Sequence, residues 1–474
     1  MSFRIEKDSL GEKKVPKDAY FGIQTLRAVE NFPISNLKAD PILIKAYAIL
    51  KKACALANAE LKLLTAKKAK AIIKATDEVI SEKFNDQFLV DVFQAGAGTS
   101  FNMNVNEVIA NRANEILGYE KGSYREINPN DDVNMAQSTN DTFPTATRLA
   151  ILLKLQNFYQ ALQKLSKTFK AKGKTFDKII KSARTHLQDA VPIRLGQEFT
   201  AYGTTLQKCL KDIQKNADDL TELGIGGTAA GTGINTHPKY RFLVVKYLRS
   251  MPLQTHYHAF AKLKNSQDLI EIMQSQQAIN HISSSIKNLA VELYRISSDL
   301  RLLASGPNTG FAEINLPAVQ PGSSIMPGKV NPSILECMNQ VCCHVIGADQ
   351  SINLAVLSGQ LDLNVYMPLM AYEILNSIEI LNNAIQMVEE KCIKGITANQ
   401  KICEKYIMQS PSLVTALNPI IGYAASAEIA KEFIKTGKPI KEIILKKGIL
   451  TEKQLEKILD VKKLTEPTLI YKVL

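Results

Sequence analysis

The spacing of proline constrains this chain more than any other feature of its sequence. Its 18 prolines leave two long windows free, between Pro144 and Pro192 and between Pro252 and Pro307. A proline inside a helix costs about 3 kcal/mol, so long helices are expected where proline is absent. In both windows, and in a third segment, apolar residues recur at alternating steps of three and four. These residues are Leu155, Phe158, Leu162, Leu165 and Phe169; Ile279, Ile282, Ile286, Leu289, Leu293, Ile296, Leu300 and Leu303; and Ile374, Ile378, Leu381, Ile385, Val388 and Cys392.

This period places one apolar seam along each helix, which is typical of helices that pack at a shallow angle in a bundle. The seam from Ile279 to Leu303 alone would span about 36 Å at 1.5 Å per residue. Strand signals are weak and limited to Arg4–Lys7, Tyr20–Phe21 and the vicinity of Ile193–Leu195. The sequence therefore predicts an all-α fold with a central bundle of long helices. Such helices cannot bury several faces alone, so we expect the chain to associate with copies of itself.

The length of 474 residues exceeds what one hydrophobic core usually covers. We expect a three-domain subunit. A mostly helical N-terminal domain covers 1–140, the long-helix bundle covers 141–394, and a small helical C-terminal domain covers 395–474. Turn-forming residues are frequent in the first domain, and Pro411, Pro419 and Gly437–Pro439 separate short helical segments in the last.

The formal net charge is +12, and basic residues gather in two segments. Residues 151–185 hold nine Lys or Arg against one acid, and residues 431–474 hold eleven Lys against six acids. Neither segment is a run of basic residues with interleaved aromatic residues, and no zinc-finger, RNP or KH pattern is visible. A solvated lysine-rich surface is the favoured interpretation, followed by steering of a small anion, with nucleic-acid binding third.

Apolar runs are short, and none approaches the ~20 residues that a membrane-spanning helix needs. The N-terminal segment MSFRIEKDSLGEKK has charges of both signs and no apolar stretch, so no secretory signal is expected. Seven widely scattered cysteines suit reduced thiols. We expect a cytoplasmic protein that binds neither membrane nor nucleic acid.

Four polar segments interrupt the helical pattern: GAGTSFNMNVNE (96–107), NPNDDVNMAQSTND (128–141), ARTHLQDAVPIRLGQE (183–198) and PGSSIMPGKVNP (321–332). Each has a purely structural interpretation. The first can be a turn before a helix that starts near Asn104, and the second an Asn/Asp turn that caps the helix after Pro144. Thr185–His186 can be a capping pair, and the fourth segment a surface loop. Loops on a rigid helical frame are also where chemistry is usually located.

Together these segments supply many hydrogen-bond donors. Gly322 and Gly328 allow backbone N–H groups to converge as an anion-binding nest. A donor-rich site suits a substrate with several negative charges, such as a dicarboxylate. The side chains concerned are Thr99, Ser100, Ser138, Thr139, Asn140, Thr185, His186, Ser323, Ser324, Lys329 and Asn331.

Templates for other kinds of site fail. GIGGTAAGTG (224–233) fits a dinucleotide-binding loop only if Ala229 takes the last glycine position, and it follows a helix-like segment instead of a strand. Gly328–Lys329–Val330 lacks the Ser or Thr of a phosphate-binding loop. His256 and His258 lie two residues apart, and Cys342–Cys343 are adjacent, so neither pair has zinc-ligand spacing. We expect no catalytic metal and no nicotinamide or flavin cofactor.

The PGSSIMPGKVNP segment resembles the shared signature of the fumarase/aspartase superfamily, and the resemblance extends almost from end to end. Further matching segments are AYFGIQTLRAVENFPIS (19–35), GIGGTAAGTGIN, EINLPAVQPG and KGITANQKICEKYI (394–407). Within the superfamily the chain is most similar to aspartases. Gln-Ser-Thr-Asn (137–140) and EINLPAVQPG stand where class II fumarases usually have Gln-Ser-Ser-Asn and EISLPENEPG.

This resemblance implies the reversible removal of ammonia from L-aspartate, which gives fumarate through an aci-carboxylate intermediate. It implies that Ser323 is the general base, and that loop N–H groups and Lys329 stabilise its alkoxide. His186 is grouped with these two residues as catalytic. The resemblance assigns the remaining contacts as follows: Thr99, Ser138, Thr139 and Ser324 to the side-chain carboxylate; Thr185, Lys329 and Asn331 to the α-carboxylate; Asn140 and His186 to the amino group; and Glu336 to a supporting role.

The resemblance further implies a homotetramer in which each site is assembled from three subunits. Residues 318–331 are expected to close over substrate, with Gly322 and Gly328 as hinges. No cofactor is expected to be required, and activation by Mg²⁺ stays open because no dedicated ligand spacing is visible. Two alternatives also stay open: a class II fumarase acting on fumarate and L-malate, and a catalytically silent scaffold of the same fold.

Overall fold

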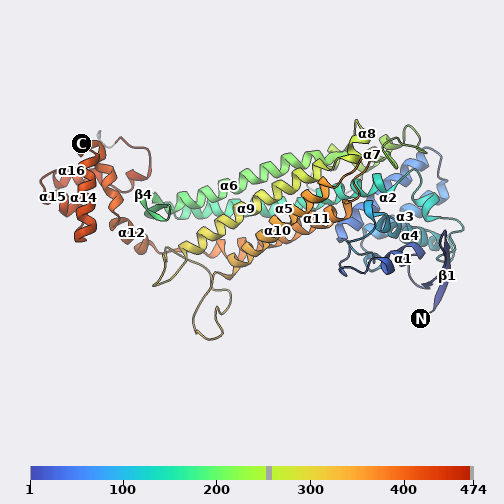
Figure 1. Cartoon of the computed structure of the whole chain (residues 1–474), viewed down its shortest axis with the longest axis horizontal. Coiled ribbons are helices and arrows are strands. Elements are labelled where there is room, and N and C mark those ends of the chain that lie inside the picture. Colours follow the sequence, from blue (N-terminus) through green and yellow to red (C-terminus); the bar gives the residue numbers. More distant parts are fainter. Residues whose placement is uncertain (1, 252–258, 470–474) are drawn as a thin grey trace. The chain divides into compact units, whose positions relative to one another are not determined.

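The computed structural model describes residues 2–251 and 259–469, and helices dominate it (Figure 1). The all-α fold class is confirmed. The chain forms two compact units, each made of three separate stretches of sequence. Unit 1 comprises residues 1–160, 209–291 and 341–383, and unit 2 comprises residues 161–208, 292–340 and 384–474. These units follow contacts in space instead of chain order, so the division into three consecutive domains stays a prediction.

Five long helices contribute residues to both units: α5 (Thr139–Thr175), α6 (Leu195–Ala217), α9 (Gln277–Leu303), α10 (Ser333–Leu357) and α11 (Met367–Lys391). The predicted apolar seams fall on α5, α9 and α11, and their side chains are buried, including Cys392 just after α11. The periodicity of the sequence therefore identified these helices correctly. One boundary differs, because α5 begins at Thr139 and contains Pro144 within its N-terminal part.

Unit 1 opens with an antiparallel hairpin of β1 (Phe3–Asp8) and β2 (Gly11–Pro16). The start of α2 has a clear cause: Pro41 occupies its first position, and Asp40 Oδ1 accepts from the Ile42 N–H at 2.9 Å. The short strands β5 and β6 pair in parallel. The other elements of unit 1 are α1 (Ile23–Asn31), α2 (Pro41–Glu60), α3 (Ala66–Ile80), α4 (Thr99–Ile116), β5 (Glu222–Leu223), α7 (Tyr240–Arg249), β6 (Lys264–Asn265) and α8 (Leu269–Gln274).

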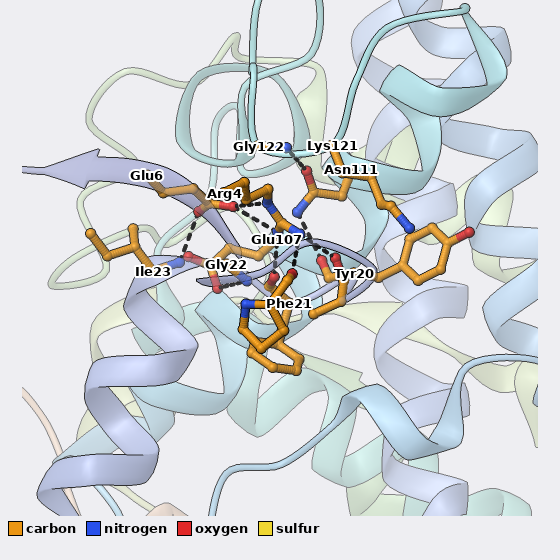
Figure 2. Close-up of polar contacts among 12 residues, drawn as sticks. Arg4, Glu6, Tyr20, Phe21, Gly22, Ile23, Glu107, Asn111, Lys121 and Gly122 are labelled. Carbon is orange, nitrogen blue, oxygen red and sulfur yellow. Dashed lines mark hydrogen bonds and ion pairs between the residues drawn. The ribbon is translucent and has the colours of Figure 1, made fainter. Parts of the chain in front are cut away.

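Buried polar side chains hold the segment between β2 and α1 (Figure 2). Arg4 of β1 donates to the Phe21 carbonyl oxygen at 2.9 Å. Glu107 of α4 accepts from the N–H groups of Gly22 and Thr25 at 2.9 and 3.1 Å. The first turn of α1 is thus capped by a carboxylate from another helix, which satisfies N–H groups that have no partner within α1.

The expected strand at Tyr20–Phe21 is wrong, because the backbone groups there bond to side chains instead of to another strand. The Tyr20 N–H donates to Gln87 Oε1 at 2.8 Å, and its carbonyl oxygen accepts from Asn111 Nδ2 at 2.8 Å. The weak signal at Arg4–Lys7 does correspond to a strand, β1.

Unit 2 contains the antiparallel hairpin of β3 (Ile180–Thr185) and β4 (Gln188–Arg194), which includes the strand expected near Ile193. Strands β7 and β8 form a second, shorter antiparallel pair. The C-terminal helices share an apolar core that includes Ile407, Leu417, Ile444 and Leu455. The remaining elements are β7 (Ile314–Asn315), β8 (Thr397–Ala398), α12 (Gln400–Met408), α13 (Asn418–Ile421), α14 (Tyr423–Thr436), α15 (Ile440–Lys446) and α16 (Glu452–Ile458).

Within the described residues, no helix combines the length and the apolar character needed to cross a lipid bilayer.

Candidate active site

The predicted site residues are distributed over both units. Unit 1 holds Thr99, Ser138, Thr139 and Asn140. Unit 2 holds Thr185, His186, Ser323, Ser324, Lys329, Asn331 and Glu336. Each set forms a local arrangement within its own unit.

In unit 1, the first two polar segments of the sequence meet at two helix N-termini. Thr99 is the first residue of α4, and Thr139 is the first residue of α5. Asn102 Nδ2 donates to Thr139 Oγ1 at 3.1 Å and so links the two helices. Gly98 has a φ of +82°, and a Cβ there would lie 2.0 Å from the Phe143 ring. Glycine is therefore required where α4 begins against α5.

Helix α4 begins at Thr99. The structural interpretation of this segment, which placed the start near Asn104, is therefore wrong. Gln94 Oε1 accepts from the Phe101 N–H at 2.9 Å. This side chain satisfies one of the unpaired N–H groups of an earlier first turn, so the helix can extend back to Thr99.

Three buried aromatic rings support this arrangement from behind. The ring centroid of Tyr47 on α2 lies 5.4 Å from that of Phe101 and 6.0 Å from that of Phe143. Both contacts are edge-to-face, the geometry that aromatic rings prefer. The rings fix α2, α4 and α5 against one another below the polar segments.

The second polar segment caps α5 by two side-chain bonds. Ser138 Oγ accepts from the Asn140 N–H at 3.2 Å, and Asp141 Oδ1 accepts from the Ser138 N–H at 2.9 Å. These bonds cap the first turn, which explains why the helix starts at Thr139 and not after Pro144. The Ser-x-x-Asp spacing was a readable signal that sequence reasoning missed.

Lys51 on α2 is a second residue that sequence reasoning missed. Its side chain is buried, and Nζ donates to Asn134 Oδ1 at 3.0 Å and to Gln137 Oε1 at 2.8 Å. Burial lowers the pKa of Lys51 to about 8. The available signal was the Lys51–Lys52 pair within an apolar helix, where two adjacent positions cannot share one face.

In unit 2, Thr185 and His186 lie at the tip of the β3–β4 hairpin and are exposed. Thr185 pairs with Gln188, so His186 and Leu187 form a two-residue turn. Both turn residues have positive φ values, 54° and 58°. Such a turn normally contains glycine or asparagine, and other residues there are strained. Strain of this kind is concentrated at functional sites, so the turn supports a role for its side chains beyond capping.

Ser323 lies on the loop between β7 and α10, where backbone N–H groups converge on its side chain. Its Oγ accepts from the Met326 N–H at 2.9 Å and from the Ile325 N–H at 3.2 Å. Gly322 pairs with Lys329 across the loop, with its N–H donating to the Lys329 carbonyl oxygen at 2.8 Å. The N–H groups that converge in this loop are those of Ile325 and Met326, and an anion-binding nest at Gly322 and Gly328 stays a prediction.

The other loop residues have different surroundings. Asn331 Nδ2 donates to the Gly322 carbonyl oxygen at 2.6 Å, and Lys329 is exposed. Glu336, in the first turn of α10, lies 3.8 Å from Arg301 in an ion pair. No ion pair between Glu336 and His186 is present among the described residues of this single chain.

The segment before the glycine-rich segment 224–233 is helical up to Thr221, as expected, and only the two-residue strand β5 stands between them. The glycine-rich segment does not open a helix directly, since turns separate it from α7. Asn140 Nδ2 donates to the Ala229 carbonyl oxygen at 2.8 Å, so this segment lies against the predicted substrate-binding residues of unit 1.

Within residues 2–251 and 259–469, no group of three or more His, Cys, Asp or Glu could hold a metal ion. His256 and His258 lie outside the described residues, as does the end of the basic segment after 469. The expectation that no cofactor is required stays a prediction.

The basic segment 151–185 is not entirely a solvated surface. Lys181 is 1% exposed and lies among carboxylates. Arg184 is also paired with a buried carboxylate. Burial of Lys181 is possible because Glu313 and Glu198 both pair with it, and the partly exposed Arg184 shares the Glu313 carboxylate.

Comparison with known proteins shows extensive similarity. Residues 11–347 match the family model described as Lyase, and residues 413–466 match Fumarase C C-terminus. The chain is 47% identical to an aspartate ammonia-lyase of Bacillus subtilis over 98% of this chain and 96% of that protein. It is similar to a solved fumarate lyase:delta crystallin from Brucella melitensis bound to cobalt, with 48% identity and a TM-score of 0.94 over 98% of this chain and 100% of that one. A class II fumarase from Schistosoma mansoni has 33% identity and a TM-score of 0.94, again over 98% and 100%.

Proposed function

Because the chain belongs to the aspartate ammonia-lyase family of the fumarase/aspartase superfamily, we propose that it converts L-aspartate to fumarate and ammonia with Ser323 as the general base. The chain is a lyase. The names of its relatives support reversible deamination of L-aspartate as the reaction, and the contacts around the polar segments support the residue roles.

The difficult step is removal of a proton from the carbon beside the side-chain carboxylate. The electron pair left behind forms an aci-carboxylate dianion, which water stabilises poorly; loss of ammonia from the neighbouring carbon then gives fumarate. Preorganised hydrogen-bond donors directed at that carboxylate stabilise the dianion, and one such donor lowers the activation free energy by about 3 kcal/mol. Thr139 suits this role, because its Oγ1 already accepts from Asn102 and its own hydrogen remains to be donated. We assign Thr99, Ser138 and Ser324 to the same carboxylate.

The observation that carries the proposal is the environment of Ser323. A serine hydroxyl is a weak base unless its alkoxide is stabilised. The Ile325 and Met326 N–H groups donate to Ser323 Oγ, and such bonds strengthen when the oxygen becomes negative. Lys329, on the same loop, adds a positive charge.

The remaining residues are assigned by the character of their polar atoms. Thr185, Lys329 and Asn331 are donors suited to the α-carboxylate, and Asn331 keeps a second amide hydrogen beyond the one that bonds Gly322. His186 and Asn140 are assigned to the amino group. Glu336 stays a supporting residue.

We further propose a cytoplasmic homotetramer that needs no cofactor and whose sites are shared between subunits. Support comes from apolar side chains exposed on the long helices. Val291 and Tyr294 on α9 are 48% and 41% exposed, and Leu354 and Leu357 on α10 are 54% and 78% exposed. Exposed apolar surface along bundle helices is typical of faces that pack against another copy.

Class II fumarase activity is the second candidate. The match of residues 413–466 and the similarity to the Schistosoma mansoni enzyme favour it. In that reaction a hydroxyl leaves instead of an amine, and the same donors would serve the carboxylates. A silent scaffold is the third possibility, and the Ser323 environment argues against it.

The test is turnover of purified full-length protein with L-aspartate and, separately, with L-malate, with fumarate followed by its ultraviolet absorbance. We expect fumarate from aspartate and little from malate. Fumarate from malate alone would favour the fumarase assignment, and no fumarate from either substrate would favour the scaffold.

A further inference from the structure

Asp141, the third residue of α5, joins the predicted substrate-binding residues to the glycine-rich segment 224–233. Its Oδ1 accepts from the Ser138 N–H, and its Oδ2 accepts from the N–H groups of Gly226 and Thr228 at 2.9 and 3.0 Å. The side chain is fully buried. A capping residue needs only the first of these bonds. The two bonds to the glycine-rich segment require a separate explanation.

The glycine-rich segment is strained at Thr228. This residue has a φ of 55°, in the left-handed region that β-branched residues rarely adopt. Its Oγ1 is buried and has no hydrogen-bond partner among the described residues. Strained backbone persists only where its surroundings impose it. The bond between the Thr228 N–H and Asp141 is one such restraint, so the carboxylate helps to hold the segment in its shape.

The next residue, Ala229, contacts the Asn140 side chain, so the shape of the segment determines how the Asn140 amide is oriented. Asn140 Nδ2 lies 2.8 Å from the Ala229 carbonyl oxygen. A carbonyl oxygen can only accept, so the amide atom that faces it is the nitrogen, and Asn140 Oδ1 is left as the acceptor for another group. The α-amino group of aspartate is an ammonium at neutral pH, with three N–H donors and no acceptor. An acceptor oxygen is the atom that such a group requires.

We propose that Asp141 is a positioning residue, which acts through the glycine-rich segment to hold the Asn140 amide with its oxygen toward the substrate ammonium. The proposal rests on the function proposed above, in which Asn140 contacts the amino group. In this proposal the glycine-rich segment helps to recognise the substrate amine. It does not serve as a dinucleotide-binding loop.

Asp141 interacts electrostatically with groups from two helices that pack near it. These groups are Tyr47, Lys51 and Cys54 of α2 and Tyr240 of α7. Burial raises the pKa of Asp141 to about 6, although three backbone N–H groups and Lys51 oppose this shift. Protonation would weaken the bonds from those N–H groups, so the orientation of Asn140 should be lost as the pH falls through this value.

Asp141→Asn tests the proposal, because it keeps the size of the side chain and replaces one acceptor oxygen with an NH₂ donor. The reaction is measured in the amination direction with ammonia and fumarate varied separately. We expect the apparent KM for ammonia to rise on the order of 10²-fold, the effect of misplacing a binding group by about 1 Å. The KM for fumarate should stay near the wild-type value. Inhibition by succinate, a dicarboxylate without an amino group, should also be unchanged.

Asp349→Asn is the matched control. Asp349 on α10 is a buried carboxylate that accepts from Ser283 Oγ at 2.6 Å and from Asn353 Nδ2 at 3.2 Å. It has no bond to a predicted site residue among the described parts of the chain. Its variant should show wild-type KM values for both substrates. A merely structural role for Asp141 would lower the yield of active enzyme without separating the two KM values.

Equal rises in the ammonia KM and in the succinate inhibition constant would overturn the proposal, because Asp141 would then support the whole pocket. If Asp141→Asn does not fold, Asn140→Ala serves as the second test, because an unchanged KM for ammonia in that variant would also overturn the proposal.

The acid limb of kcat/KM near pH 6 should be present in the wild type and absent in Asp141→Asn. Failure of the wild-type protein to deaminate aspartate would instead count against the proposed function.

Discussion

Lys181 Nζ lies 2.7 Å from Glu313 Oε2, and both side chains are almost completely buried. Arg184 donates to both oxygens of the same carboxylate at 3.0 and 2.9 Å, and Lys181 also lies 3.1 Å from Glu198. Lys181 and Arg184 belong to the strand that leads to the His186 turn, and Glu313 immediately precedes β7 and the serine loop. Two predicted catalytic segments of unit 2 are therefore joined at their bases by buried ion pairs.

Replacing Glu313 should destabilise the protein strongly. Glu313→Gln leaves the buried Lys181 with Glu198 alone and the partly exposed Arg184 without its carboxylate, so we expect the free energy of unfolding to fall by about 3–5 kcal/mol. Urea denaturation followed by circular dichroism at fixed protein concentration measures this change.

The double variant Arg184→Met/Glu313→Leu removes one charge of each sign and leaves the Lys181–Glu198 pair. Most of the lost stability should return, because no unpaired charge stays buried. A double variant as unstable as Glu313→Gln would contradict the assignment of the loss to an uncompensated charge.

Ser323→Ala removes the proposed base while leaving the loop backbone unchanged. General-base catalysis typically contributes 10²–10⁴-fold, so kcat should fall by about that factor. Helix content and oligomeric state should not change. Ser250→Ala, at the C-terminus of α7, serves as the control and should retain full activity. Near-normal turnover by Ser323→Ala would refute the assigned base.

Gly322 is expected to tolerate no side chain. A Cβ at this position would lie 2.5 Å from the Lys329 carbonyl oxygen, the acceptor of the Gly322 N–H bond. Gly322→Ala should therefore displace Ser323 and lower kcat/KM at least tenfold, an effect of misplacement. Gly118→Ala is the control without a close contact, since a Cβ there meets open space and any strain comes from its φ of +85°, a conformation that Gly322 does not adopt. An activity loss in Gly118→Ala as large as that in Gly322→Ala would show that the close contact is not responsible.

Closure of residues 318–331 over substrate should be visible by limited trypsin digestion. Lys329 is exposed on this loop, and Lys447, which follows α15, is an exposed reference site. Saturating succinate should slow cleavage after Lys329 and leave cleavage after Lys447 unchanged. If ligand does not alter the ratio of the two cleavage rates, the loop does not close.

Glu107 should make stability depend on pH in an uncommon direction. Burial raises the pKa of Glu107 from an ordinary value of 4.5 to about 7. The shift is upward although Glu107 accepts hydrogen bonds from the start of α1 (Figure 2). Between these values the folded protein binds a proton that the unfolded chain has released. The contribution of Glu107 to the free energy of unfolding should therefore fall as the pH rises through this window, by about 3 kcal/mol in total.

This contribution can be isolated by comparison with Glu107→Gln, which has no titrating group at that position. The difference in unfolding free energy between the two proteins should change from pH 4.5 to pH 7 and then level off. A difference that does not vary with pH would mean that the pKa of Glu107 is the same in the folded and unfolded states.

The helical architecture was readable from the sequence because the relevant information is local. Apolar residues three and four positions apart lie on one helix face whatever the rest of the chain does. The seams of α5, α9 and α11 and the glycine-bearing polar segments follow from such local patterns. The sequence pattern also identified Ser323 and Lys329 as members of one loop, since they are close in the chain.

Other features depended on partners far away in sequence. The β3–β4 hairpin could not be predicted from a glycine-containing turn, because His186 and Leu187 occupy the two positive-φ positions where glycine or asparagine usually stands. Lys51 gave no indication that it would bond Gln137, which lies on another segment.

The sequence by itself determined the helices, the family signature and the set of donor side chains. Only the tertiary structure decided which carboxylates are buried and which segments they join. Asp141 contacts Thr228 across 87 positions of the chain. Such a contact exists only after the helices pack, because burial makes an unpaired polar group costly and so determines which distant donors a carboxylate must bind.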